Sequence, residues 1–276
     1  VIPPQYDDLG FFSDGLAAAR VGALWGYIDE KNVWVIPPQF EYATGFSEGL
    51  AAVRIGGLWG YIDSHGAVVI KPQFRNDFAF GRVSPRERQD WHFDSGVARV
   101  RIDSHWALLG RKGELRTAAV FDAIGDFHEG IAGVRIGKKW GFLSSDGSVV
   151  VPVQYDGVGI FSGGLARVKA GERYGFVNQK GQISIPIEFE AADNFSEGLA
   201  PVMRAGEYGF LDASGTLRIR GPFVRADRFS DSLAAVAIRE RDGTEQYGYI
   251  NTAGKFVIAP GFDSASEFRF GRAFVG

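Results

Sequence analysis

The chain has 276 residues, of which 45% are hydrophobic and 23% charged, with a formal net charge of −3 and no cysteine. These proportions are ordinary for a globular protein and argue against disorder, and the small negative charge gives no electrostatic footprint for nucleic acid. The absence of cysteine excludes disulfides, thiolate metal ligands and cysteine nucleophiles. No apolar run approaches the ~18 residues of a membrane-spanning helix.

Three short apolar runs separated by turn residues make up each unit of the sequence, as residues 50–70 illustrate. Leu50–Ile55 ends at a Gly-Gly pair, Trp59–Asp63 ends at a turn containing Gly66, and Ala67–Ile70 stops before Pro72. Runs of four to six residues bounded by Gly, Asp or Ser are typical of strands joined by tight hairpins. No segment keeps a 3.6-residue apolar period long enough for a substantial helix. The sequence therefore predicts an all-β fold.

This unit recurs along the whole chain, and an aromatic–Gly pair marks its second run. The pairs are Trp25-Gly26, Trp59-Gly60, Trp140-Gly141, Tyr174-Gly175, Tyr208-Gly209 and Tyr247-Gly248, with Trp106-Ala107 as a degenerate copy. Successive copies are 34, 47, 34, 34, 34 and 39 residues apart. A fixed period with two enlarged intervals indicates a repeat architecture. We predict one repeat domain over residues 1–276, with about seven full units and a partial one.

A second motif follows the third run, which a Phe or Tyr closes. About six residues later comes Phe-Ser-Glu-Gly or a relative, at Phe12–Gly15, Phe46–Gly49, Phe127–Gly130, Phe161–Gly164, Phe195–Gly198 and Phe229–Ser232. Aromatic residues at a fixed register predict an apolar seam between stacked repeats. The glycine is expected to take a positive φ, and the acidic residue before it, such as Glu48, to bond a backbone N–H in that turn. A ring of carboxylates that binds cations is the alternative.

These motifs resemble, in the same order, those of the bacterial WG (KWG) repeat family. The matching stretches are Val-Ile-Pro-Pro-Gln-Phe at residues 35–40, Phe-Ser-Glu-Gly-Leu-Ala-Ala-Val at 46–53 and Trp-Gly-Tyr-Ile-Asp at 59–63. The resemblance covers essentially the whole chain. It implies a bacterial source, tandem β-repeats and no enzymatic chemistry. Later copies replace Trp by Tyr, and Ala107 replaces Gly, which weakens a ligand-binding role for the aromatic residue in every unit.

Two arrangements of the units remain open. Three strands, with a short fourth around residues 44–46, could form small blades of a β-propeller, although ordinary blades have ~40–45 residues. The alternative is an open β superhelix, a solenoid in which each unit contacts only its neighbours. The chain starts on an expected third strand, Val1–Tyr6, and ends on an expected first strand, Gly271–Val275, which could pair to close a ring. We favour a closed or nearly closed propeller-like array.

No motif carries catalytic or metal chemistry. The histidines are His65, His92, His105 and His128, and no pair has metal-ligand spacing. The sequence also lacks a G-x-S-x-G nucleophile elbow, a Walker A loop and a Rossmann fingerprint. We therefore expect a protein that is not an enzyme and that uses no metal or cofactor.

The two enlarged intervals depart from the repeat. The first carries 13 extra residues between Phe74 and Phe93, near residues 80–92, and the second carries five around residues 239–246. Insertions in repeat proteins map to loops, often on a binding face, and Arg and Trp are enriched in interface hot spots. The alternative is a pair of tolerated loop extensions. The predicted partner-binding residues are Arg86, Arg88, Trp91, His92, Arg239 and Arg241.

The expected function is that of a non-catalytic protein-binding scaffold. Its sharpest form is a bacterial immunity or inhibitor protein that binds a secreted toxin or effector, in the periplasm or at the cell surface rather than in the cytoplasm. The alternative is a carbohydrate- or cell-wall-binding module whose aromatic–Gly hairpins stack against sugars. A third hypothesis is an enzyme that uses carboxylates dispersed along the chain. Neither nucleic-acid binding nor membrane insertion is expected.

Overall fold

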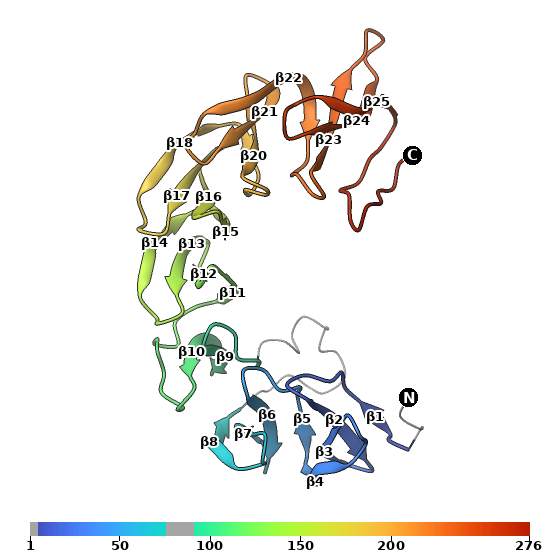
Figure 1. The fold of residues 1–276 in the computed structure, drawn as a ribbon. Helices are drawn as coiled ribbons and strands as arrows, with labels where there is room; N and C mark the ends of the chain where they lie inside the picture. Colours follow the sequence, from blue (N-terminus) through green and yellow to red (C-terminus); the bar gives the residue numbers. More distant parts are fainter. Residues whose placement is uncertain (1–4, 76–90) are drawn as a thin grey trace. The chain divides into compact units, whose positions relative to one another are not determined.

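A computed structural model describes residues 5–75 and 91–276 of the chain, which contain 25 strands and no helix (Figure 1). The all-β prediction is thereby confirmed. The chain divides into two compact units, one of Val1–Phe127 with Ser145–Ser148 and one of His128–Ser144 with Val149–Gly276.

The strands of the first unit are β1 (Asp8–Leu9), β2 (Leu16–Val21), β3 (Leu24–Asp29), β4 (Trp34–Phe40), β5 (Tyr42–Ala43), β6 (Leu50–Ile55), β7 (Leu58–Asp63), β8 (Val68–Phe74), β9 (Val97–Ile102) and β10 (His105–Gly110). β11 (Ala123–His128) covers the boundary between the units in the sequence. The second unit has β12 (Ile131–Ile136), β13 (Lys139–Ser144), β14 (Val149–Tyr155), β15 (Gly157–Ser162), β16 (Leu165–Ala170), β17 (Arg173–Asn178), β18 (Ile183–Phe189), β19 (Ala191–Ala192), β20 (Leu199–Arg204), β21 (Glu207–Asp212), β22 (Leu217–Ala226), β23 (Leu233–Arg239), β24 (Glu245–Asn251) and β25 (Phe256–Phe262).

The first two runs of each repeat form an antiparallel hairpin, as β6 and β7 show. Gly56 and Gly57 in its turn have φ values of 59° and 78°, which glycine adopts without the steric cost that a Cβ would impose. The next turn is closed by Asp63, whose Oδ1 accepts hydrogen bonds from the backbone N–H groups of His65 and Ala67, each at 2.9 Å. The side chain thereby replaces a backbone partner and ends the strand.

The third strand explains why glycine follows the aromatic residue. β8 pairs with β7 through two register shifts that bring its backbone close to Gly60. A Cβ on Gly60 would lie 2.5 Å from the carbonyl oxygen of Ile70 and 2.7 Å from the nitrogen of Pro72. β8 ends the order β5-β6-β7-β8, and an edge strand tolerates Pro72 because its outer N–H positions have no ladder partner.

Ala107 is tolerated because the third repeat lacks this strand. β9 and β10 form a two-stranded sheet, and the residues after β10 form no strand with it. They make the isolated bridges Trp106↔Phe121 and Leu109↔Leu115, and Leu108 accepts from the N–H of Arg116 and donates to the hydroxyl of Thr117. Ala107 is fully buried, at 0% exposure. With no bulged third strand over it in the described part of the chain, the methyl group fits. The degenerate copy is therefore a consequence of local topology.

The short fourth strand lies slightly earlier than expected, at Tyr42–Ala43 instead of residues 44–46. It pairs with the first strand of the following hairpin, Tyr42 opposite Arg54 and Ala43 opposite Val53. Each such four-stranded sheet therefore begins with the connector that leaves the preceding repeat.

An apolar seam joins successive repeats, as the spacing of the aromatics predicts. Phe46 is 1% exposed, and its ring lies 4.8 Å from that of Tyr27 in the preceding repeat. The hydroxyl of Tyr27 donates to the carbonyl of Thr44 at 2.8 Å. The equivalent ring contacts are Tyr61–Phe93, Phe142–Phe161, Phe176–Phe195, Phe210–Phe229 and Tyr249–Phe268.

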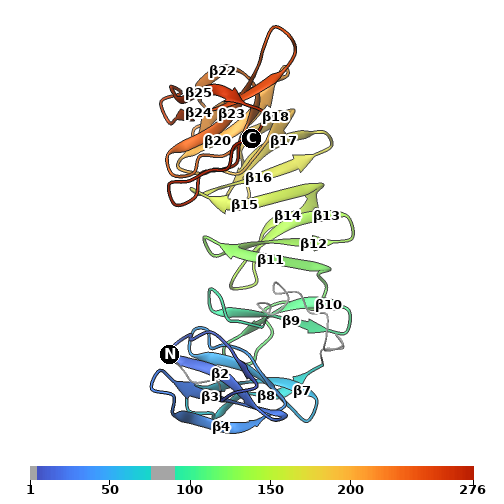
Figure 2. The ribbon, with the colours of Figure 1, turned by 90° about the vertical axis from the view of Figure 1, so that its right-hand side faces the viewer.

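Near the end of the second unit the sheets merge. The ten-residue β22 pairs with both β21 and β23, so that β19–β25 form one seven-stranded sheet (Figure 2). The strand predicted at Gly271–Val275 is wrong, because Val275 and Arg272 make only isolated bridges, to Ala265 and Arg269. The strand predicted at Val1–Tyr6 lies mostly outside the described residues, and Tyr6 is not in a strand.

Candidate partner-binding surface

The long insertion starts and ends in the hydrophobic core of the first unit. Phe74, at the end of β8, is 7% exposed and Trp91 is 5% exposed, and their ring centroids are 6.4 Å apart. Arg86 and Arg88, predicted to bind a partner, lie outside the described residues. Both ends of the insertion are therefore held at neighbouring core positions.

Trp91 is a core residue in this structure. Its ring stacks on that of Trp59, with centroids 5.2 Å apart and planes inclined by 16°. Tyr42 continues this row of rings, since its ring centroid lies 5.6 Å from that of Trp59 and 5.2 Å from that of Trp25. The sequence placed Trp91 among loop residues that meet a partner. Trp91 is instead buried, and it anchors one end of the insertion. A stacked aromatic pair adds about 0.5–1.5 kcal/mol to the stabilisation that comes from the area it buries.

His92 is the predicted residue that faces a cavity. It lines a space of about 230 Å³ together with Ser47, Asp94, Arg99 and Asp126. Its Nε2 atom is buried and has no hydrogen-bond partner among residues 5–75 and 91–276, and burial lowers the pKa of the imidazole. The ring is therefore neutral at pH 7, and it retains an unused polar atom beside a polar cavity.

The shorter insertion lengthens a hairpin. β23 and β24 pair up to Arg239↔Glu245, and the side chain of Arg239 donates to Glu245 at 3.1 Å. Glu245 also accepts from Nε of Arg225 at 3.2 Å, and these bonds, that from Arg239 first, hold the pKa of its carboxyl below the ordinary value. Arg241 is exposed in the turn. Of this predicted pair, Arg239 is already engaged and Arg241 is open to solvent.

Sequence reasoning did not find that the Phe-Ser-Glu-Gly turns bind one another across repeats. We expected each carboxylate to bond an N–H of its own turn, whereas it accepts from the same turn of the following repeat. The bonds run from Gly49 to Asp14, Gly96 to Glu48, Gly163 and Gly164 to Glu129, Ser232 to Glu197 and Gly271 to Asp231. The serine of the motif also bonds the following repeat, since Ser47 Oγ donates to the carbonyl of Phe93 at 2.6 Å. The recurrence of this motif at the repeat period is the feature of the sequence from which these contacts between turns could have been predicted.

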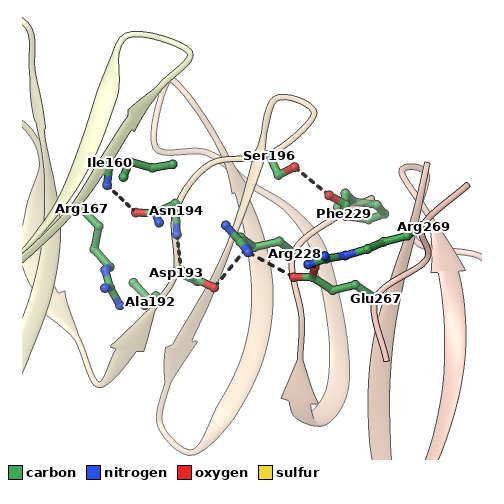
Figure 3. A network of polar contacts seen from close by, with 10 residues as sticks. All are labelled: Ile160, Arg167, Ala192, Asp193, Asn194, Ser196, Arg228, Phe229, Glu267 and Arg269. Atoms are coloured by element: carbon green, nitrogen blue, oxygen red, sulfur yellow. Dashed lines mark hydrogen bonds and ion pairs between the residues drawn. The ribbon is translucent and has the colours of Figure 1, made fainter. Parts of the chain in front are cut away.

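A row of ion pairs joins successive connectors of the second unit (Figure 3). Nε of Arg228 lies 3.4 Å from Asp193, and its Nη2 donates to Glu267 at 3.1 Å. Glu267 also accepts from Arg269 at 3.3 Å. Since such exposed pairs are individually worth about 0–1 kcal/mol, the row orients the connectors more than it stabilises them.

Carboxylates of the repeat motif therefore face backbone N–H groups. Within residues 5–75 and 91–276, no three His, Cys, Asp or Glu side chains are grouped so as to hold a metal ion. His65 occupies a hairpin turn, and His105 lies 3.9 Å from Asp122. The part of the chain that the structure describes also contains no helix with the length and apolar character to cross a membrane.

A model of the WG-containing repeat matches the chain at residues 1–25, 25–59, 59–76, 106–140, 140–174, 174–207 and 247–275. These segments cover well over half of the sequence. The chain belongs to the WG-containing repeat family. The WG repeats that the motifs predict are thereby confirmed, and the boundaries of most matched segments fall at the aromatic of the aromatic–Gly pair. The unmatched stretches contain most of the long insertion and all of the short one.

None of the curated proteins compared with this WG-repeat chain matches it. Solved structures resemble it only distantly. A eukaryotic initiation factor has 10% identity and a TM-score of 0.43 over 96% of this chain and 80% of its own. PorZ of Porphyromonas gingivalis has 8% identity and a TM-score of 0.31 over 92% and 45%. Hsv2 of Kluyveromyces lactis has 9% identity and a TM-score of 0.35 over 76% of this chain and 75% of its own. Likenesses at this level say nothing about function.

Proposed function

We propose that the WG repeats of this chain form a non-catalytic scaffold that binds a protein partner through the long insertion. In its specific form the proposal is an immunity or inhibitor protein of the periplasm or cell surface that binds a secreted toxin or effector. One observation carries it: Phe74 and Trp91 hold the two ends of the insertion together in the core. A segment whose two ends are held by a rigid core is a common place for binding residues.

The chemistry of the insertion supports the proposal. Arg86 and Arg88 belong to a residue type enriched in interface hot spots, and Pro85 precedes them. Anchoring at Trp91 lowers the conformational freedom that the segment loses on association, which lowers the cost of ordering. His92 lines a polar cavity next to the anchor.

The hydrogen bonds that the repeated carboxylates accept support a non-catalytic role. A general acid or base needs a free proton site near the reacting group, whereas the carboxylates of Asp14, Glu48, Glu129, Glu197 and Asp231 each accept backbone N–H bonds. Their function is to join repeats.

The test uses the protein that co-purifies with the intact chain from its native organism. Residues 82–90 are replaced by a short linker, with Trp91 retained so that the anchor survives. We expect a nearly unchanged melting temperature and at least tenfold weaker binding, about 1.4 kcal/mol. Shortening the β23–β24 hairpin between Arg239 and Glu245 tests the other insertion in the same way, because Arg241 in its turn is also a predicted partner-binding residue. Full affinity after the 82–90 deletion contradicts the proposal, and so does loss of folding, which would place the insertion in the core.

We also propose that the WG repeats build a propeller-like closed array, with an open superhelix as the alternative. Similar ring contacts, with centroids 4.8–5.1 Å apart, recur between successive repeats within each unit, and a regular contact between neighbouring repeats is what either array requires. Small-angle scattering distinguishes a compact disc, which is the expected result, from an elongated rod, which contradicts it.

A further inference from the structure

The second unit holds a cleft of about 690 Å³ at the sixth repeat, the one with Tyr208-Gly209. The cleft lies beside the end of β18, the β20–β21 hairpin and β22, and Phe189, Tyr208 and Leu217 supply its apolar lining. Small-molecule sites typically have ~300–1,000 Å³ and combine an apolar lining with a few polar groups. The size and lining of this cleft fit that class.

The sixth repeat differs from the others where the cleft opens. Gly221 stands two residues before the closing aromatic, where the other third strands carry Pro38, Pro72, Val153, Ile187 and Pro260. Arg204 ends a first strand whose equivalents are Val21, Ile55, Ile102, Ile136, Ala170 and Ile238. A small residue has replaced a bulky one, and a charged residue has replaced an apolar one. A Cβ on Gly221 would lie 2.4 Å from the ring of Phe223, so the ring occupies the space that a side chain at this position would need, and Arg204 is the residue that sets the lining of this cleft apart.

Two acids and two bases line the mouth of the cleft. Arg204 donates to Glu188, and its guanidinium lies 5.3 Å from the centre of the Phe189 ring. Glu207 and Arg220 also line the cleft and are exposed. Neither of these two side chains has a hydrogen bond or ion pair within the described residues. The mouth has no net charge, and it offers one unused carboxylate and one unused guanidinium.

From this arrangement we propose that the cleft binds a neutral saccharide. A sugar ring has an apolar C–H face that packs on an aromatic ring such as that of Tyr208, and hydroxyl groups around its edge. The planar carboxylate of Glu207 and guanidinium of Arg220 are suited to charge-assisted, two-point hydrogen bonding with neighbouring hydroxyls. Balanced rim charges give no preference for an acidic or a basic ligand.

An added peptide strand fits the cleft less well. β18 is the last strand of the sheet β15-β16-β17-β18, but the carbonyl of Glu188 on it already accepts from Arg173 at 3.2 Å. Pro186 on the same strand has no N–H to donate. The edge of β18 therefore offers an incomplete ladder for backbone pairing.

The cleft lies in the second unit, whereas the long insertion starts and ends in the first unit. Isothermal titration of the intact chain with cellopentaose, maltopentaose and chitopentaose tests saccharide binding by the cleft. We expect at least one of these neutral sugars to bind with a dissociation constant of about 1 mM or lower. Glu207→Ala and Arg220→Ala should each weaken that binding tenfold or more, whereas Tyr208→Phe, which keeps the ring, should retain most of it.

Arg218→Ala is the matched control, since Arg218 lies on the same strand, pairs with Asp212 and does not line the cleft. It should bind like the parent, and melting curves show that all variants fold. Three results would overturn the proposal: no binding of any of the three sugars, binding that neither Glu207→Ala nor Arg220→Ala weakens, or binding of pentagalacturonate alone, which would make the ligand an acid.

Discussion

Trp59 lies between Tyr42 and Trp91 in the core of the first unit and is 4% exposed. We predict that Trp59→Ala lowers the free energy of unfolding by about 3–5 kcal/mol, the usual cost of emptying a buried aromatic site. Trp140 is half-buried, with the guanidinium of Arg135 5.8 Å from its ring centre. Trp140→Ala should therefore cost less. Chemical denaturation of both variants measures the difference, and equal losses would show that burial does not distinguish the two sites.

We predict that the carboxyl group of Asp212 makes the stability of the folded protein depend on pH. A hydrogen bond from Ser214, and then one from Arg218, lower the pKa of its carboxyl to about 2. Since the folded pKa is below the ordinary value of 3.8, the stabilisation is present above pH ~3.8 and is lost as the pH falls toward 2. Asp212→Asn should keep the turn, as Asn178 and Asn251 do at the same position, and remove this dependence.

Melting temperatures of the Asp212→Asn protein and the parent between pH 2 and pH 7 measure the effect. The two curves should converge toward the acid end. Asp212→Ala is the control that loses the acceptor at every pH, and its destabilisation should persist at neutral pH. Parallel curves for Asn and parent would contradict the assignment.

At the level of the three-stranded element, the close approach of the third strand makes glycine necessary. Gly60→Ala would place a Cβ 2.5 Å from the carbonyl oxygen of Ile70, so the strand must move, and we expect a loss of about 1–3 kcal/mol or more. Gly261→Ala is the matched control, because a Cβ there meets nothing within 4 Å. Denaturation curves should separate the two variants. A harmless Gly60→Ala would also remove the explanation given for Ala107.

The serine of the Phe-Ser-Glu-Gly turn joins one repeat element to the next. Ser196 Oγ donates to the carbonyl of Phe229 at 2.7 Å (Figure 3), and Ser196→Ala should cost about 1 kcal/mol, the typical net value of such a bond. Ser162 holds the same place in the preceding repeat, and its hydroxyl has no hydrogen bond within the described residues. Ser162→Ala should therefore change stability by less than about 0.5 kcal/mol. Equal effects in urea titrations would contradict this role of the seam.

For the molecule as a whole we predict stability that does not depend on a metal. The chain has no cysteine and only four histidines, and the carboxylates of its repeat motif bind backbone N–H groups of neighbouring repeats. A chelator such as EDTA should leave the melting temperature of the intact protein unchanged. A decrease of several degrees would reveal an oxygen-ligated site, most simply for Ca²⁺.

The sequence by itself determined the strands, the hairpins, the repeat period and the family, because each depends on neighbours within a few residues. Glycines in turns, Asx residues after the second strand and short apolar runs bounded by turn residues act locally. The apolar seam was also predictable, since Phe46 and its equivalents recur at one register. Even the position of the insertions followed from counting residues between aromatic–Gly pairs.

Only the tertiary structure decided which groups meet across repeats. That Trp91 stacks on Trp59, that Glu48 bonds Gly96 of the next repeat, and that a cleft lies between the end of β18 and the β20–β21 hairpin all depend on how one sheet is placed against the next. Such contacts join residues tens of positions apart, and their geometry is set by packing of whole sheets, which local propensity does not encode. A tryptophan at the end of an insertion reads the same in sequence whether it meets a partner or the core.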